Sequence, residues 1–165
     1  MRGLVVGRFQ PLHCGHEQLI RHAVAECDEV VVAIGSSTEP QSLRNPFSFE
    51  ERAAMVNAVF PTVRVVGVPD IHDEARWVAH CLRITGPVER AYGNDAQTLS
   101  LFEEAGIPTS SPGLRERSAW QATKLRKQMA SGDQAWRGQV PDGAEKLLDS
   151  WGAPQRLRVL AGKMG

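Results

Sequence analysis

The feature that most constrains the fold is a short, continuous apolar run, Val30-Val31-Val32-Ala33-Ile34, which Gly35-Ser36-Ser37 stops at once. A run of mainly β-branched residues without polar alternation is typical of a strand that is buried on both faces, as in a parallel sheet. A second short strand, Leu4-Val5-Val6, ends at Gly7, and residues 15–26 between the two strands carry apolar side chains at helical spacing. The chain therefore begins as a strand–helix–strand unit.

Strand and helix go on alternating with short connections along the first two thirds of the chain. Ser48 and Glu51 have the spacing of a capping box, which predicts a helix continuing to Phe60. Such alternation predicts an α/β fold, a Rossmann-like parallel sheet of about five strands flanked by helices. The further strands are expected at residues 63–68, 88–92 and 107–109, and the further helices at residues 73–84 and 95–105.

The pattern changes to helices after Pro112. A basic helical stretch is expected over residues 119–130, a short helix near Trp136 and another over residues 142–150. We expect a single domain over residues 1–165, in which residues 1–112 form the Rossmann-like core and residues 113–165 a helical annex; Trp120, Trp136 and Trp151 could serve the core of this annex or an interface.

Composition excludes several classes of function. The 165 residues contain 19 Lys+Arg against 19 Asp+Glu, so no large net field draws the protein to nucleic acid or to a membrane. The apolar start breaks at Gly7-Arg8, which is too short for a secretory signal and predicts a cytoplasmic protein. The three cysteines are odd in number and lack CxxC spacing, which argues against a disulfide framework or a cysteine zinc site.

The most informative segment is Gly7-Arg8-Phe9-Gln10-Pro11-Leu12-His13-Cys14-Gly15-His16, between the first strand and the first helix. Open α/β sheets bind ligands there, beyond the carboxyl ends of their strands. Gly7 permits a tight turn and Gly15 allows close approach of a phosphate. His13 and His16 flank a helix start, which favours anions. Together they predict a polyphosphate clamp.

Simpler interpretations of these residues stay open. Either histidine taken singly is more often a solvated residue, and a His-x-x-His pair could bind a metal, although no third ligand lies nearby in the sequence. Other nucleotide motifs are missing, because the chain contains no GxxxxGK[ST] and no GxGxxG follows the first strand.

The segment resembles the GRFQPxHxGH signature of the HxGH nucleotidyltransferase superfamily, and it is most similar to the archaeal-type nicotinamide mononucleotide (NMN) adenylyltransferases. The similarity extends over roughly residues 1–140. Its further segments are Ile34-Gly35-Ser36-Ser37, Leu43-Arg44-Asn45-Pro46-Phe47 with Glu51-Arg52, Val68-Pro69-Asp70-Ile71 and Arg76-Trp77-Val78-Ala79-His80.

This resemblance implies transfer of AMP from ATP to NMN by direct in-line attack at the α-phosphate, giving NAD and pyrophosphate. It implies Mg²⁺ held mainly by the ATP phosphates, no protein metal site, and a homo-oligomer. The implied catalytic residues are Arg8, His13, His16 and Arg126. The implied ATP-binding residues are Gly7, Arg8, Phe9, His13, Gly15, His16, Arg44, Thr123 and Arg126, and the implied NMN-binding residues are Gly35, Ser36, Asp70 and Trp77.

The sequence departs from the family pattern in two places. Gln121 and Ala122 stand where the SxTxxR motif has serine and a small residue, and Tyr92-Gly93-Asn94-Asp95 replaces Tyr-Ser-Gly-Asn. Two alternatives therefore stay open: transfer to another phosphomonoester, and a non-catalytic nucleotide-binding regulator. Plainer roles also remain for single residues: solvated surface for Arg8, Arg44 and Arg126, a helix cap for Asp70 and the hydrophobic core for Trp77.

Overall fold

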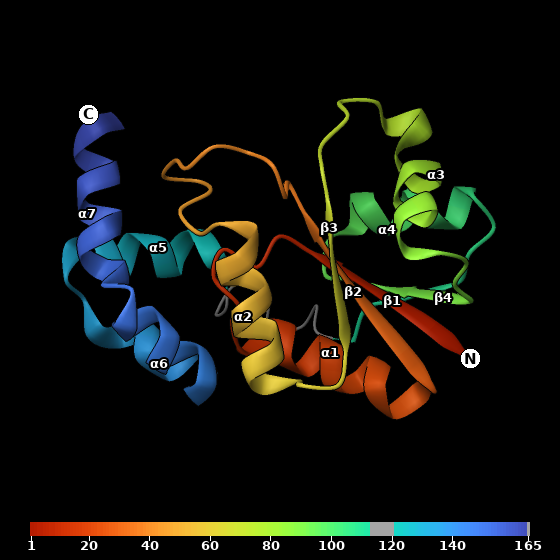
Figure 1. The fold of residues 1–165 in the computed structure, drawn as a ribbon, viewed down its shortest axis with the longest axis horizontal. Helices are drawn as coiled ribbons and strands as arrows, with labels where there is room; N and C mark the ends of the chain where they lie inside the picture. Colours follow the sequence, from red (N-terminus) through yellow and green to blue (C-terminus); the bar gives the residue numbers. More distant parts are fainter. Residues whose placement is uncertain (113–120, 165) are drawn as a thin grey trace.

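The computed structural model describes residues 1–112 and 121–164, as an α/β core with helices gathered at one end (Figure 1). Trp120 and the first two residues of the predicted 119–130 helix lie outside the described residues. The strands are β1 (Arg2–Gly7), β2 (Glu29–Gly35), β3 (Arg64–Val68), β4 (Arg90–Tyr92) and β5 (Thr109–Ser110); the helices of the core are α1 (Cys14–Glu26), α2 (Phe49–Val59), α3 (Glu74–Thr85) and α4 (Ala96–Glu104).

The five strands form one parallel sheet in the order β3-β2-β1-β4-β5. This confirms the predicted α/β class and the number of strands; β5 begins two residues later than expected. The chain moves outward from β1 to β3 and then returns to the other side of β1 for β4. The order therefore reverses between β1 and β4, which makes the carboxyl ends of these two strands the switch point where open sheets bind ligands.

Both faces of the sheet are covered, as the apolar run in β2 predicts. Val30, Val32 and Ile34 belong to the hydrophobic cluster that α1 and α2 share, whereas Val31 and Ala33 belong to the cluster with α3 and α4. Successive strand residues point to opposite faces, so an unbroken apolar run serves both layers. All five side chains are at most 6% exposed.

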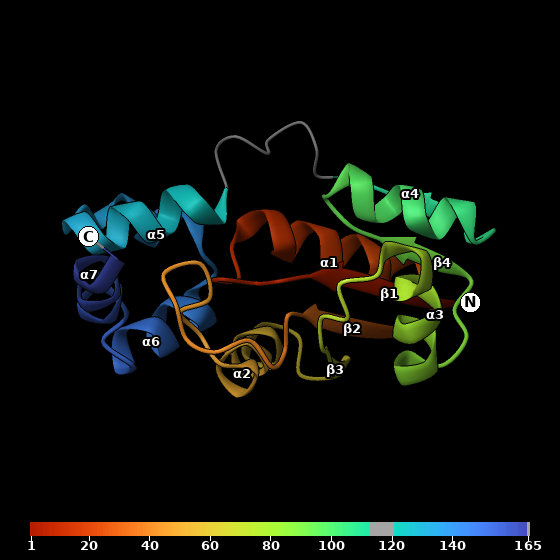
Figure 2. The same ribbon diagram turned by 90° about the horizontal axis from the view of Figure 1, so that it is seen from above.

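The remaining helices form the annex: α5 (Ala122–Ser131), the short 3₁₀ helix η2 (Gln134–Gln139), α6 (Asp142–Ser150) and α7 (Ala153–Met164). Figure 2 shows them beside α2, beyond the carboxyl ends of the strands. The contact between α6 and α2 is close, because a Cβ added at Gly143 would lie 3.3 Å from the Cβ of Ala58. No helix in the described part of the chain is long and apolar enough to cross a membrane.

Candidate active site

A cavity of about 540 Å³ lies at the switch point, where the loops after β1 and β4 leave the sheet. The loops after β2 and β3 and the first turns of α1, α3 and α4 complete its wall. Its lining residues are Val6, Gly7, Arg8, His13, Gly15, His16, Leu19, Gly35, Ser36, Asp70, Glu74, Trp77, Gly93, Asn94, Asp95, Gln97, Thr98, Leu101 and Gln121.

Both histidines of the predicted clamp line this cavity, and they also cap helix α1. The backbone N–H of Gly15 donates to Nδ1 of His13, and the backbone N–H of His13 donates to Nδ1 of His16, each over 3.1 Å. This is a capping box made by two imidazoles. Because each Nδ1 accepts a hydrogen bond, the proton of each neutral ring resides on Nε2. The helix start therefore fixes two Nε2–H donors in one tautomer.

Both imidazoles are neutral at pH 7. Burial lowers the pKa of His13 to about 4. Burial, followed by the influence of His13, lowers the pKa of His16 well below its usual 6.5. His13 is buried and His16 half-buried, and in such surroundings a hydrogen bond from Nε2–H to an incoming phosphate oxygen is stronger than it would be in bulk solvent.

The positive charge of the site comes from arginines. Arg126 on α5 donates from Nη1 to the carbonyl of Gln10 over 2.8 Å and from Nη2 to Oγ1 of Thr123 over 3.2 Å. Burial lowers the pKa of Arg126 to about 10, and repulsion from Arg8 and Arg44 adds to the shift. Arg126 still carries its charge at pH 7. Within residues 1–112 and 121–164 none of these three arginines pairs with a carboxylate, so the cluster attracts anions.

The structure distributes the predicted ATP-binding residues over two cavities. Arg44, Thr123 and Arg126 line a second cavity of about 380 Å³ between the loop before α2 and the helices α5 and α7, and they do not line the first. Phe9 lines neither cavity and is 1% exposed. Its ring lies where a side chain at position 7 would be, since a Cβ added at Gly7 would come within 2.9 Å of it. The ring of Phe9 thus packs against Gly7 and supports the loop between β1 and α1.

All four residues predicted to bind NMN line the first cavity. Ser36 Oγ donates to Oδ2 of Asp70 over 2.8 Å, which joins the loops after β2 and β3. The alternative role of Asp70 as a helix cap is wrong, because Asp73 occupies the N-cap position of α3. Trp77 is half-buried and meets Phe102 edge-on, with ring centroids 5.7 Å apart. It packs on the core and also faces the cavity.

The sequence predictions did not include the wall that follows β4. Six residues there line the cavity: Gly93, Asn94, Asp95, Gln97, Thr98 and Leu101. Asn94 Oδ1 is buried and has no hydrogen-bond partner among the described residues, so it can accept an N–H group from a ligand. The altered family segment Tyr92-Gly93-Asn94-Asp95 was the sequence signal for the start of this wall. The strand order supplies the rest, by placing β4 beside β1 at the switch point.

Residues 4–86 match the cytidylyltransferase-like family. Over 98% of this chain and 97% of the relative, the sequence is 34% identical to a nicotinamide-nucleotide adenylyltransferase of Methanothrix thermoacetophila. It is 30% identical to the enzyme of the same name from Archaeoglobus fulgidus, over 99% of each chain. The chain belongs to the nicotinamide-nucleotide adenylyltransferase family.

The fold of this family member is also that of a larger protein. A bifunctional NMN adenylyltransferase/ADP ribose pyrophosphatase from Francisella tularensis, crystallised with AMP and a manganese ion, superposes with a TM-score of 0.74 at 20% identity. The match covers 98% of this chain and 52% of that one, so the chain spans about half of the bifunctional protein. At this identity the likeness concerns the fold.

The family motif SxTxxR is altered at the start of α5. Gln121, in place of the usual serine, is the N-cap residue of this helix, but its side chain makes no capping hydrogen bond. It lines the cavity instead. Gln121 therefore lies at the first cavity, whereas Thr123 and Arg126 of the same motif line the second.

Proposed function

We propose that this protein is a nicotinamide-nucleotide adenylyltransferase, which transfers AMP from ATP to NMN and releases NAD and pyrophosphate. The observation that carries the proposal is the imidazole capping box: two Nε2–H donors of fixed tautomer at a helix N-terminus, in a cavity at the switch point of the sheet. The match to curated relatives over nearly the whole chain supports the same reaction.

The chemistry requires positioning rather than a base. The phosphate monoester of NMN carries about −1.5 to −2 charges at pH 7, so its oxygen is already a nucleophile. That oxygen forms a bond to the α-phosphorus of ATP while the bond from the α-phosphorus to the bridging oxygen breaks, and pyrophosphate leaves with the electron pair. The cost lies in bringing two anions together in line.

The residues of the site divide this task by their charge. His16 donates from Nε2 to the α-phosphate, where charge develops on the equatorial oxygens. His13 and Arg8, which line the first cavity, donate to the triphosphate, and the charges of Arg44 and Arg126, which line the second cavity, help to offset the charge of the departing pyrophosphate. Because the histidines are neutral, the attack of the NMN anion depends on the arginines for its electrostatic attraction.

On the acceptor side, the loops after β2 and β3 and helix α3 hold NMN. The cavity presents the backbone of Gly35, the hydroxyl of Ser36 and the carboxylate of Asp70 near one another. Trp77 offers an aromatic surface to the nicotinamide ring, which in NMN is a pyridinium cation and interacts favourably with the face of an indole.

A divalent cation, Mg²⁺ in our proposal, would reach the site on the triphosphate. The described residues contain no group of three or more His, Cys, Asp or Glu side chains that could hold a metal ion. Mg²⁺ suits such a site because it keeps several waters and binds substrate phosphates. When bound, it neutralises charge on the phosphates.

The test is to incubate the purified protein with ATP, Mg²⁺ and NMN and to follow NAD by its coupled reduction with an alcohol dehydrogenase. We expect NAD formation whose rate falls on the order of 10²–10³-fold in His16→Asn. Absence of NAD with ATP still bound would contradict the proposal, and other phosphomonoesters would then be screened as acceptors.

Two further expectations stay predictions: the protein works in the cytoplasm, and it forms a homo-oligomer. Sedimentation equilibrium of the purified protein would test the second.

A further inference from the structure

Neither the sequence motifs nor the proposed reaction assigns a role to Arg52 on α2. Its side chain is 0% exposed. Its Nη1 donates to the carbonyls of Arg8 (3.0 Å) and Gly35 (2.8 Å), and its Nη2 to the carbonyl of Ser36 (3.0 Å). Its Nε donates to the carbonyl of Ser48 over 3.2 Å.

These carbonyls lie where the sheet ends. The β1–β2 ladder runs from the pair Arg2 and Glu29 to the pair Gly7 and Ile34. Beyond it the two strands lead into the loops of the site, where the carbonyl of Ser36 also accepts the backbone N–H of Glu39 over 3.4 Å. Buried carbonyls need donors, and the guanidinium of Arg52 supplies them. One nitrogen atom, Nη1, joins the loop that carries the histidines to the loop after β2.

Arg52 keeps its positive charge although no carboxylate pairs with it. Among the ion pairs of the described chain none includes Arg52. Burial, followed by repulsion from Arg8, lowers its pKa to about 10, so it is still protonated at neutral pH. A buried cation without a counter-charge is costly. Here its partners are four backbone carbonyls, whose dipoles partly compensate.

We propose that Arg52 is the positioning residue that sets the spacing between the ATP loop at Arg8 and the NMN loop at Gly35-Ser36. The inference rests on the proposed function. The reaction needs the NMN phosphate in line with the α-phosphate, and the two substrates are held by two different loops. Arg52 is the side chain that bonds to both loops, so it determines how the bound substrates face each other.

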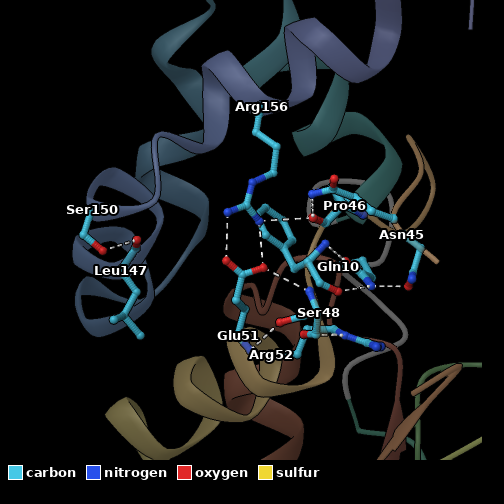
Figure 3. Close-up of polar contacts among 11 residues, drawn as sticks. Gln10, Asn45, Pro46, Ser48, Glu51, Arg52, Leu147, Ser150 and Arg156 are labelled. Atoms are coloured by element: carbon cyan, nitrogen blue, oxygen red, sulfur yellow. Dashed lines mark hydrogen bonds and ion pairs between the residues drawn. The ribbon is translucent and has the colours of Figure 1, made fainter. Parts of the chain in front are cut away.

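The surroundings of Arg52 hold α2 in place and supply a matched control. Its neighbour Glu51 forms a two-pronged ion pair with Arg156 of α7, over 2.7 and 2.8 Å (Figure 3). Arg156 also donates to the carbonyl of Pro46 over 3.1 Å. Replacing Arg156 therefore removes a guanidinium that anchors the same helix, without touching the bonds between Arg52 and the two loops.

The test compares Arg52→Met and Arg52→Lys with Arg156→Met, in active-site-titrated enzyme. A displacement of about 1 Å at a reacting centre can cost on the order of a hundredfold in rate. We expect kcat of Arg52→Met to fall roughly 10- to 100-fold, while the Kd values for ATP alone and NMN alone change by less than about threefold, because each loop still binds its own substrate. Arg52→Lys keeps the positive charge but loses the planar, forked guanidinium that reaches several carbonyls at once. We expect its kcat to lie between those of Arg52→Met and the wild type.

Rescue of kcat by a small molecule distinguishes a positioning role of Arg52 from a merely structural one. In Arg52→Ala, millimolar guanidinium chloride can occupy the vacated space and should raise kcat, whereas urea, of similar shape but neutral, should raise it less. If Arg52→Met and Arg52→Ala do not fold, the Arg52→Lys comparison decides.

Three results would overturn the assignment: kcat of the Arg52 variants within a few-fold of wild type, an equal kcat loss in Arg156→Met at a matched loss of Tm, or Kd values that weaken as much as kcat falls. Wild-type enzyme that forms no NAD would instead contradict the proposed function, so the two failures are distinguishable.

Discussion

The rings of His13 and His16 stack on each other, with their centroids 3.7 Å apart and their planes inclined by 24°. Each ring also accepts one backbone N–H at the start of α1. A proton on either Nδ1 would remove a cap of the helix and place a positive charge against a buried neighbouring ring. The pair is therefore built to work as two neutral donors.

Two substitutions at His16 separate its structural role from its catalytic role. His16→Asn keeps an acceptor near the position of Nδ1 but loses the Nε2 donor, so we expect near-normal Tm and a kcat reduced on the order of 10²–10³-fold. His16→Ala removes both the cap and the donor, so it should lose about 1 kcal/mol of stability in addition to a similar loss of kcat. Thermal melts and steady-state kinetics measure both, and wild-type kcat in His16→Asn would refute the assignment.

Stability should fall in mildly acidic solution. The pKa of His13 is about 4 and that of His16 is well below 6.5 in the folded protein, whereas both lie near 6.5 in the unfolded chain. Unfolding therefore takes up protons below pH 6.5, and the free energy of unfolding decreases as the pH falls from there toward 4.

Each histidine contributes up to about 1.4 kcal/mol per pH unit in this window. Urea titrations at several pH values between 7 and 4.5 measure the slope. In His13→Asn this slope should be smaller by the contribution of one proton. A stability that stays flat over this range would contradict the neutral state of the pair.

Trp77→Ala should raise KM for NMN more than KM for ATP. The indole lines the cavity near Ser36 and Asp70, and its interaction with a pyridinium is worth roughly 1–2 kcal/mol in a partly desolvated site, which corresponds to about 5- to 30-fold in KM. Because Trp77 also packs on Phe102, some loss of Tm will accompany the change. Equal increases for both substrates would mean that packing alone matters.

The wall near Trp77 should favour NMN over its deamido form. Glu74 and Asp95 line the cavity and accept hydrogen bonds from Gln97 and Thr98, and neither forms an ion pair within the described ranges. Two unit charges 4 Å apart in water interact by about 1 kcal/mol, so the added carboxylate of deamido-NMN should be disfavoured about fivefold by one such group.

Glu74→Gln should narrow the ratio of kcat/KM for the two acceptors, and Glu104→Gln, on α4 outside the cavity, should leave it unchanged. A ratio that stays constant in Glu74→Gln would show that this carboxylate does not discriminate.

We propose that core and annex unfold together. Trp136 and Leu148 of the annex belong to the same hydrophobic cluster as Val5 and Ile20 of the core. Leu148→Ala removes a fully buried side chain, at a cost of about 2–5 kcal/mol. It should lower a single Tm by roughly 5–15 °C, with the same midpoint by far-ultraviolet circular dichroism and by tryptophan fluorescence. Two separate transitions would show independent units.

The periodic part of the fold could be predicted because its signals are local. The capping box at Ser48 and Glu51 predicted the start of α2, and both of its hydrogen bonds are present, at 3.0 and 3.1 Å. Helix α7 was missed, although Gly152 followed by Pro154 in the first turn is a recognisable start signal. Its buried residues Ala153, Leu157 and Leu160 also have helical spacing, so the local signal for this helix was present in the sequence.

The predicted site was incomplete for a different reason. The histidine segment could be interpreted because its spacing is local, but the role of the two imidazoles as a capping box does not follow the usual Ser/Thr-x-x-Glu/Gln pattern. Arg52 could not be identified as buried, since its partners are carbonyls 4 to 44 residues away. Residues 93–95 belong to an altered family segment, whereas Gln97, Thr98 and Leu101 have no motif and only the strand order brings them to the cavity.

The imidazole capping box also bears on how such a chain can change over evolutionary time. In many enzymes a reactive side chain can be exchanged without harm to the scaffold, and stability often improves. In this chain the atoms that start helix α1 and the atoms that present donors to the phosphates belong to the same two rings. A substitution at either histidine therefore weakens helix α1 as well as catalysis. Selection against misfolded chains then also conserves the two catalytic side chains.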